Sequence, residues 1–207
     1  MNVFDLFLLA TAAGLLFSKS LNHSIVLLGL EGMLLGAVEF FSGPPAWSTA
    51  LIALATVAVK VTLIPGILWR LARSLPTNAR TEQPLPLWAF AAALAAVLGT
   101  GHIIQMLEPS RLVLDVMAFF CALCTVWLGM VMVVARRHLL SQVTALVSIE
   151  NGLMLVGVSL AGSLPGFIEL GILADLAAAV TILAWMSHRI HAELRTTDVV
   201  ALQSLKG

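Results

Sequence analysis

The chain has 207 residues, of which 60% are hydrophobic and 11% are charged, and its formal net charge is zero. Soluble domains contain about 25% charged residues, so this composition excludes an ordinary water-soluble protein. A lipid bilayer is the solvent that suits such a chain, and the backbone polar groups must then be satisfied within helices. The zero net charge says nothing about partners, and we expect no contact with nucleic acid.

Apolar windows of about 20 residues, the length that crosses the hydrocarbon core, occur seven times along the chain. The N-terminal window carries Asp5 and lacks a basic start, so we interpret it as a membrane helix and not as a cleaved signal. The sequence therefore predicts an all-α polytopic membrane helix bundle with about seven transmembrane helices, six or eight being the alternatives. The predicted spans are residues 3–18, 23–42, 48–70, 86–107, 112–134, 139–161 and 166–188.

Lys and Arg are distributed unequally between the two sides of this predicted bundle. Arg111 is the one basic residue in the loops of one side, and Lys60 lies inside a helix. Basic loops stay on the cytoplasmic side of a membrane, so we expect the N-terminus outside and the C-terminus in the cytoplasm. The nine basic residues expected on the cytoplasmic side are Lys19, Arg70, Arg73, Arg80, Arg136, Arg137, Arg189, Arg195 and Lys206.

Two parts of the chain repeat one arrangement of ionisable residues. In each, a carboxylate lies within the second helix, at Glu31 and at Glu150, and another ionisable residue follows in the third helix, at Lys60 and at Asp175. We interpret the two parts as three-helix units that run in the same direction across the membrane, a parallel repeat. The expected divisions are units at 1–75 and 111–190, a cytoplasmic loop plus connecting helix at 76–110, and a cytoplasmic tail at 191–207.

The four ionisable residues within helices are candidates for a proton relay. A charge at the bilayer centre costs about 2.5–3.5 kcal/mol on insertion scales. A buried Glu near a Lys can hold or release a proton according to the state of its partner. One hypothesis is a water-linked proton path through Glu31, Lys60, Glu150 and Asp175. The alternative is that Lys60 pairs with a carboxylate only to neutralise both charges and hold the helices together.

Other polar residues carry weaker signals. Glu169 lies near the outer end of its helix and is a candidate outer access point for protons. Simple solvation at the interface is the interpretation we favour for Glu169, Glu39 and Asp115. Cys121 and Cys124 form "CALC" within a predicted helix that offers no further ligands, so we expect both to pack against neighbouring helices. We expect no metal, no cofactor and no catalytic residue in this chain, and any redox centre would lie on other chains.

Two segments carry a resemblance to known membrane subunits. "IVLLGLEGMLL" around Glu31 and "VTALVSIENGLMLVGVSL" around Glu150 resemble the K subunit of respiratory complex I and the C subunit of multi-subunit cation/proton antiporters. The length, the seven predicted helices and "SIENGLMLVGVSLAGSLPGFIELGILADLAAAV" are similar to the hydrogenase-4 component E family, a membrane subunit of formate hydrogenlyase-type and related energy-converting NiFe hydrogenases. The resemblance is strongest over about 136–190 and thinner over 1–75.

The resemblance implies a non-catalytic subunit of a complex I-related redox complex in the cytoplasmic (inner) membrane of a prokaryote. Its implied partners are antiporter-like and H-subunit-like membrane subunits, a peripheral NiFe hydrogenase-like arm and the surrounding lipid. In the K-subunit pattern two mid-membrane glutamates lie on the second and third helices. The first corresponds to Glu31 and Glu150, and the second to Asp175 and, with its charge reversed, to Lys60, which would act as a relay group or as a fixed cation.

Two other functions remain open from the sequence. The first is a subunit of a multi-subunit cation/proton antiporter that has no redox arm and uses the same relay residues. The second is an autonomous small transporter or receptor-like protein, which would need a distinctive substrate cavity with broken helices. Apart from Pro65, within a predicted span, the sequence offers no sign of such a cavity.

Overall fold

The chain forms a bundle of apolar helices. The structure, a computed structural model, describes residues 3–42, 47–74, 81, 85–107, 115–161, 172–174, 176–183 and 185. Nearly all of these residues are helical, and Ser20 and Thr81 form an isolated β-bridge. The predicted all-α membrane helix bundle is therefore confirmed.

The helices follow the predicted spans closely. The first half contains α1 (Val3–Phe17), α2 (Leu21–Ser42), α3 (Trp47–Val57), the π-helical η1 (Ala58–Leu63) and α4 (Ile64–Ser74). The second half contains α5 (Leu87–Leu107), α6 (Val116–Ala135) and α7 (Leu139–Ala161). Because α3, η1 and α4 follow one another without interruption, we call them together the α3–α4 rod.

Five of these helical segments are long and apolar enough to cross a membrane, namely α2, the α3–α4 rod, α5, α6 and α7. The chain is therefore a multi-pass membrane protein. Two shorter apolar segments, α1 with 15 residues and the helical residues between Ile172 and Leu183, coincide with the first and last predicted spans. That these two also cross the membrane, giving seven spans, stays a prediction.

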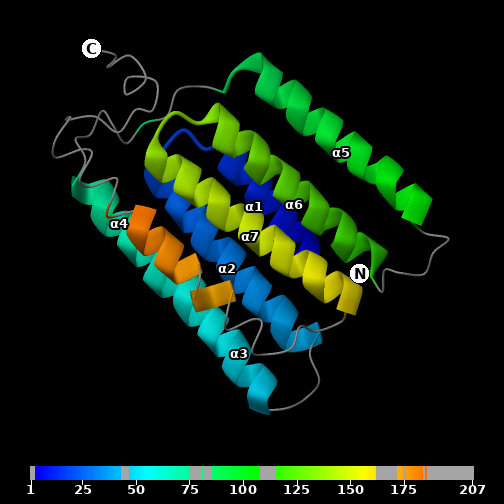
Figure 1. Cartoon of the computed structure of the whole chain (residues 1–207), viewed down its shortest axis with the longest axis horizontal. Helices are drawn as coiled ribbons and strands as arrows, with labels where there is room; N and C mark the ends of the chain where they lie inside the picture. Colours follow the sequence, from blue (N-terminus) through cyan, green and yellow to red (C-terminus); the bar gives the residue numbers. More distant parts are fainter. Residues whose placement is uncertain are drawn as a thin grey trace.

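Four helices form the centre of the bundle. In Figure 1, α5 lies at one edge beside α6, and the α3–α4 rod lies at the opposite edge. Between them α1 packs against α2 and α6, and α7 packs against α6 and α2. The second helices of the two predicted units, α2 and α7, are thus in direct contact, which brings together the parts of the sequence that carry Glu31 and Glu150.

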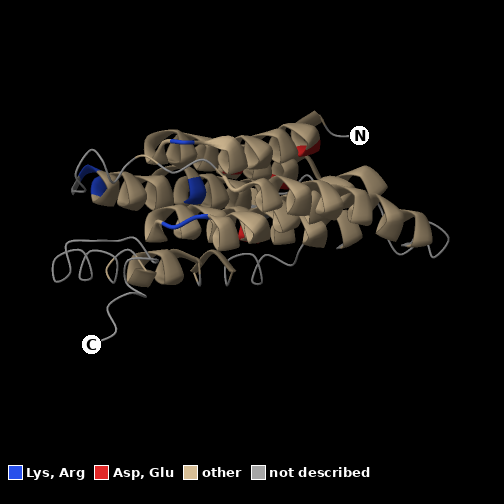
Figure 2. Ribbon diagram, turned by 90° about the horizontal axis from the view of Figure 1, so that it is seen from above, with Lys and Arg blue, Asp and Glu red and all other residues tan. Residues whose placement is uncertain are grey.

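The charged residues are separated along the bundle. Figure 2 shows the described Lys and Arg in the half remote from the N-terminal end of α1. This separation agrees with the predicted orientation, which itself stays a prediction.

The turn between α6 and α7 is tied to the end of α1 by Arg136. This residue is only 4% exposed. Its Nη2 donates hydrogen bonds to the carbonyl oxygens of Leu16, at 2.7 Å, of Leu15, at 3.4 Å, and of Ser18. The last carbonyls of a helix have no partner within the helix, so a buried arginine satisfies them here.

Glycines allow the central helices to approach closely. A Cβ atom added at Gly32 of α2 would lie 2.6 Å from Lys60 Cβ, and one at Gly36 would lie 2.5 Å from Val57 Cγ2. A Cβ at Gly129 of α6 would lie 2.5 Å from Ile149 Cγ1 of α7. Small residues at helix contacts are the usual means of close packing in membranes. The glycines of α2 thereby fix the distance between α2 and the α3–α4 rod at the level of Lys60.

Candidate functional site

Lys60 lies on the buried face of the α3–α4 rod. Every third or fourth residue of this face is buried, through Ala53, Thr56, Lys60 and Ile64, and Lys60 itself is 1% exposed. The helix widens here into the π-type turn η1, in which the N–H of Ile64 donates to the carbonyl of Val59, five residues earlier. Pro65 follows, and its ring would clash with a carbonyl four residues back in a regular α-helix, which gives a physical reason for the wider turn.

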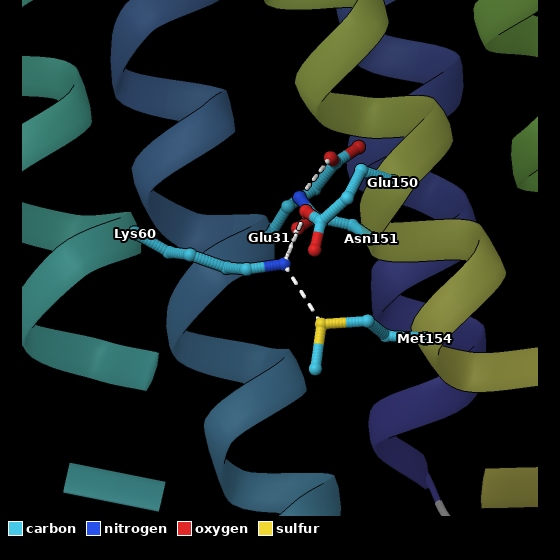
Figure 3. A network of polar contacts seen from close by, with 5 residues as sticks. All are labelled: Glu31, Lys60, Glu150, Asn151 and Met154. Atoms are coloured by element: carbon cyan, nitrogen blue, oxygen red, sulfur yellow. Dashed lines mark hydrogen bonds and ion pairs between the residues drawn. The ribbon is translucent and has the colours of Figure 1, made fainter. Parts of the chain in front are cut away.

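The ammonium group of Lys60 reaches across α2 to α7 (Figure 3). It forms an ion pair with Glu150 Oε2 and donates to Asn151 Oδ1 at 2.7 Å. Its third contact is Met154 Sδ, at 3.2 Å. All three partners lie on α7, so one lysine fastens the α3–α4 rod to the centre of the bundle.

Glu31 is fully buried between α2 and α7. Its carboxylate accepts a hydrogen bond from Ser148 Oγ and another from Asn151 Nδ2, each at 3.0 Å. Asn151 therefore bridges two groups: its amide oxygen accepts from Lys60 while its amide nitrogen donates to Glu31. We call the connected set of Glu150, Lys60, Asn151 and Glu31 the Lys60 network.

The Lys60 network is not balanced in charge. It contains one cationic group and two carboxyl groups, all in helices long enough to span a membrane. With Lys60 charged, the network is neutral only when one of the two carboxyl groups carries a proton. Because an unbalanced charge in a water-poor interior is costly, the network has a physical reason to hold one exchangeable proton.

Glu150 is the most accessible member of the Lys60 network. Its side chain is 16% exposed, against 1% for Lys60. Its Oε2 binds Lys60, whereas its Oε1 is buried without a hydrogen-bond partner among the described residues. A buried carboxylate oxygen in this state is a place where an ordered water is expected.

Three of the four predicted relay residues, Glu31, Lys60 and Glu150, are thus brought into one network. Asp175 and Glu169 lie outside the described residues, so their expected roles stay predictions. Sequence reasoning missed Asn151 and Ser148. Both are polar residues on the face of α7 that meets α2, and the i, i+3 spacing of Ser148 and Asn151 was the available signal.

The other polar residues divide between capping and packing. Asp115, expected to be solvated, is partly exposed and also caps α6: its Oδ1 accepts from the backbone N–H groups of Met117 and Ala118, at 3.1 and 3.0 Å. Glu39, also expected to be solvated at the interface, is only 6% exposed, so its side chain is buried within the bundle. Cys121 and Cys124 are free thiols buried on α6, in agreement with the packing role expected for them.

The chain is 33% identical over 150 residues to "Hydrogenase-4 component E" of Escherichia coli, a match that covers 72% of this chain and 69% of the relative, and equally similar to the protein of that name in Shigella flexneri. It is 25% identical over 202 residues to an uncharacterized protein of Mycobacterium tuberculosis, a match that covers 93% of this chain and 89% of that protein. No protein-family model and no solved structure matches the chain.

Proposed function

The chain belongs to the hydrogenase-4 component E family, and we propose that it relays protons through the Lys60 network as a non-catalytic subunit of an energy-converting hydrogenase complex. The similarity to hydrogenase-4 component E supports a membrane subunit of a hydrogenase complex. The relay, the formate hydrogenlyase type of the complex and the location in the inner membrane of a prokaryote are parts of the proposal. Its partners would be antiporter-like and H-subunit-like membrane subunits and a peripheral NiFe hydrogenase-like arm.

The observation that carries the relay is the connection of ionisable groups from three helices. Lys60 of the α3–α4 rod contacts Glu150 of α7, and Asn151 joins Lys60 to Glu31 of α2. When a proton arrives at Glu150, the negative charge beside Lys60 disappears, and the ammonium charge is then balanced by Glu31 alone. Proton uptake at one end of the network is thus coupled electrostatically to the state of the other end.

The proposal extends the path beyond the described residues. Asp175 follows Glu150 in the second predicted three-helix unit and would continue the relay on the last helix. Glu169, six residues before Asp175, would be an access point for protons at the outer end of the same helix. With them, the path would run laterally through the membrane from one unit to the next, toward neighbouring subunits of the complex.

Substitution of Glu150 by Gln tests the relay directly. The amide keeps the shape of the side chain but cannot take up a proton, so we expect proton movement driven by the complex to fall by at least about tenfold, a change of about 1.4 kcal/mol in the barrier. Proton movement is measured in inverted membrane vesicles with a pH-sensitive dye. Hydrogenase activity with an artificial electron donor is expected to stay normal.

The control is Thr62→Val on the same rod, where the hydroxyl is exposed and, within the described part of the chain, donates only to the carbonyl of Ala58 in its own helix. Affinity purification of both variants from native membranes, with the companions identified by mass spectrometry, shows whether the complex assembles. Unchanged proton movement in assembled Glu150→Gln would refute the relay. Companions that include antiporter-like subunits but no redox arm would point to a cation/proton antiporter instead.

A further inference from the structure

Thr56 carries a buried hydroxyl group that makes no hydrogen bond to the described residues. It lies one turn before Lys60 on the same buried face of the α3–α4 rod and is 0% exposed. Threonines within helices usually turn the hydroxyl back to their own backbone, and Thr62, Thr100, Thr125 and Thr181 each donate to the carbonyl four residues earlier. Thr56 Oγ1 has no hydrogen-bond partner among the described residues. Its hydroxyl therefore has a free donor and acceptor inside the bundle.

Glu39 lies on the face of α2 that packs against the same part of the rod. It follows Gly32 by seven residues and Gly36 by three, which places all three on one side of the helix. A Cβ at Gly32 would touch Lys60, and one at Gly36 would touch Val57 and lie 3.4 Å from the carbonyl oxygen of Ala53. Because α2 and the rod run in opposite directions, Glu39 continues this series toward the N-terminal end of the rod.

Two further observations connect Glu39 to the Lys60 network. Glu39 is 6% exposed, and it is close enough to Lys60 to interact with it electrostatically. It lies three residues before Ser42, the last residue of α2, and eight residues after Glu31, a rise of about 12 Å. Glu39 thus stands between the buried network and the end of the bundle at which α1 begins.

We propose that Thr56 and Glu39 hold ordered water between Lys60 and this end of the bundle, giving the Lys60 network an aqueous branch across the membrane. A buried water needs two to four polar partners, and the Thr56 hydroxyl, the Glu39 carboxyl group and the Lys60 network supply them. The water site depends on the packing of α2 against the rod and does not depend on the proposed function. Its use as a proton access rests on the function proposed above.

Cysteine accessibility in the intact complex tests the water site. In a background with Cys121 and Cys124 replaced by Ala, Thr56→Cys is treated in membrane vesicles with 2-aminoethyl methanethiosulfonate, a small water-soluble thiol reagent, and labelling is followed by mass spectrometry. The matched control is Leu8→Cys, which is 0% exposed within an apolar cluster and lies nearer the same end of the bundle. We expect Thr56→Cys to react at least tenfold faster than Leu8→Cys.

Equal, slow labelling of Thr56→Cys and Leu8→Cys would overturn the water site. Glu39→Cys, on the α2 side of the proposed water site, is expected to react as fast as Thr56→Cys. If Thr56→Cys does not assemble, the labelling rate of Glu39→Cys relative to Leu8→Cys tests the water site instead. For the proton access, Thr56→Ser keeps the hydroxyl and should retain proton movement, whereas the isosteric Thr56→Val should lower it severalfold. Normal proton movement in Thr56→Val, with Glu150→Gln impaired, would refute the access but not the relay.

Discussion

At the scale of single residues, the contacts of Lys60 serve two possible roles, holding helices together and relaying protons. Its ammonium binds Glu150, Asn151 and Met154 at once, so it holds the α3–α4 rod against α7 whether or not protons move. A structural ion pair and a relay group therefore make the same contact in the structure, and a loss of proton movement after removal of one charge is expected for either role. Breaking a buried pair on one side leaves the other charge uncompensated, at a cost of about 3–5 kcal/mol.

A paired apolar substitution separates the two roles. Lys60→Met and Glu150→Leu are each expected to lower the thermal stability of the purified complex, because each leaves one charged partner behind. The double variant Lys60→Met/Glu150→Leu removes both members of the ion pair, and Glu31, which still accepts hydrogen bonds from Ser148 and Asn151, is neutral there when it carries a proton. The variant is therefore expected to regain stability, as replacement of buried ion pairs by apolar residues often does. Its proton movement should nevertheless stay below about a tenth of normal. Normal proton movement in the stable double variant would show that the pair is only structural.

At the scale of helices, the contact between α2 and the rod places Lys60 where it acts. Gly32→Ala would bring a methyl group to 2.6 Å from Lys60 Cβ and 3.1 Å from its carbonyl carbon and oxygen. The backbone of the rod would have to move away from α2, and Lys60 would withdraw from Glu150. We expect a loss of about 1–3 kcal/mol in stability, typical of overpacking, together with impaired proton movement.

Gly66→Ala is the matched control for this substitution. Gly66 lies in α4 of the same rod, and a Cβ there would meet no atom of the described residues within 4 Å. Ala has the higher helix propensity, so this variant should be neutral or slightly stabilising. Thermal denaturation of the two purified variants measures the difference. Equal stability would mean that the close approach at Gly32 does not position the rod.

Much of this arrangement could be predicted from the sequence. An apolar run long enough to cross the bilayer predicts a membrane helix, and a charged residue within such a run indicates a site that is costly to bury. The predicted span 139–161 coincides with α7, and Glu31, Lys60 and Glu150 stood out for the cost of burying them. The sequence of a single helix does not show how the helix is rotated about its axis or which helices it contacts. The bridging by Asn151, the burial of Glu39 and the capping of α1 by Arg136 all depend on which faces meet, and so they appear only in the folded chain.

At the scale of the whole molecule, the separation of charge along the bundle bears on its orientation. The described Lys and Arg gather in the half remote from the N-terminal end of α1 (Figure 2). Arg136, although buried as a helix cap, lies in a turn at that same end, beside Arg137. If that end faces the cytoplasm, as the positive-inside rule requires, the aqueous branch at Thr56 and Glu39 leads to the opposite side of the membrane.

An odd number of spans places the two termini on opposite sides, and this consequence distinguishes seven helices from six or eight. We expect alkaline phosphatase, which is active only outside the cytoplasm, to be active when fused after residue 44 or residue 110 and inactive when fused after residue 78, residue 137 or the C-terminus. A green fluorescent protein fused at the same positions should give the reverse pattern. An active phosphatase at the C-terminus, with the other fusions as expected, would mean that the helical residues between Ile172 and Leu183 do not cross the membrane. The second predicted unit would then lack its third span, and Asp175 could not extend the Lys60 network as proposed.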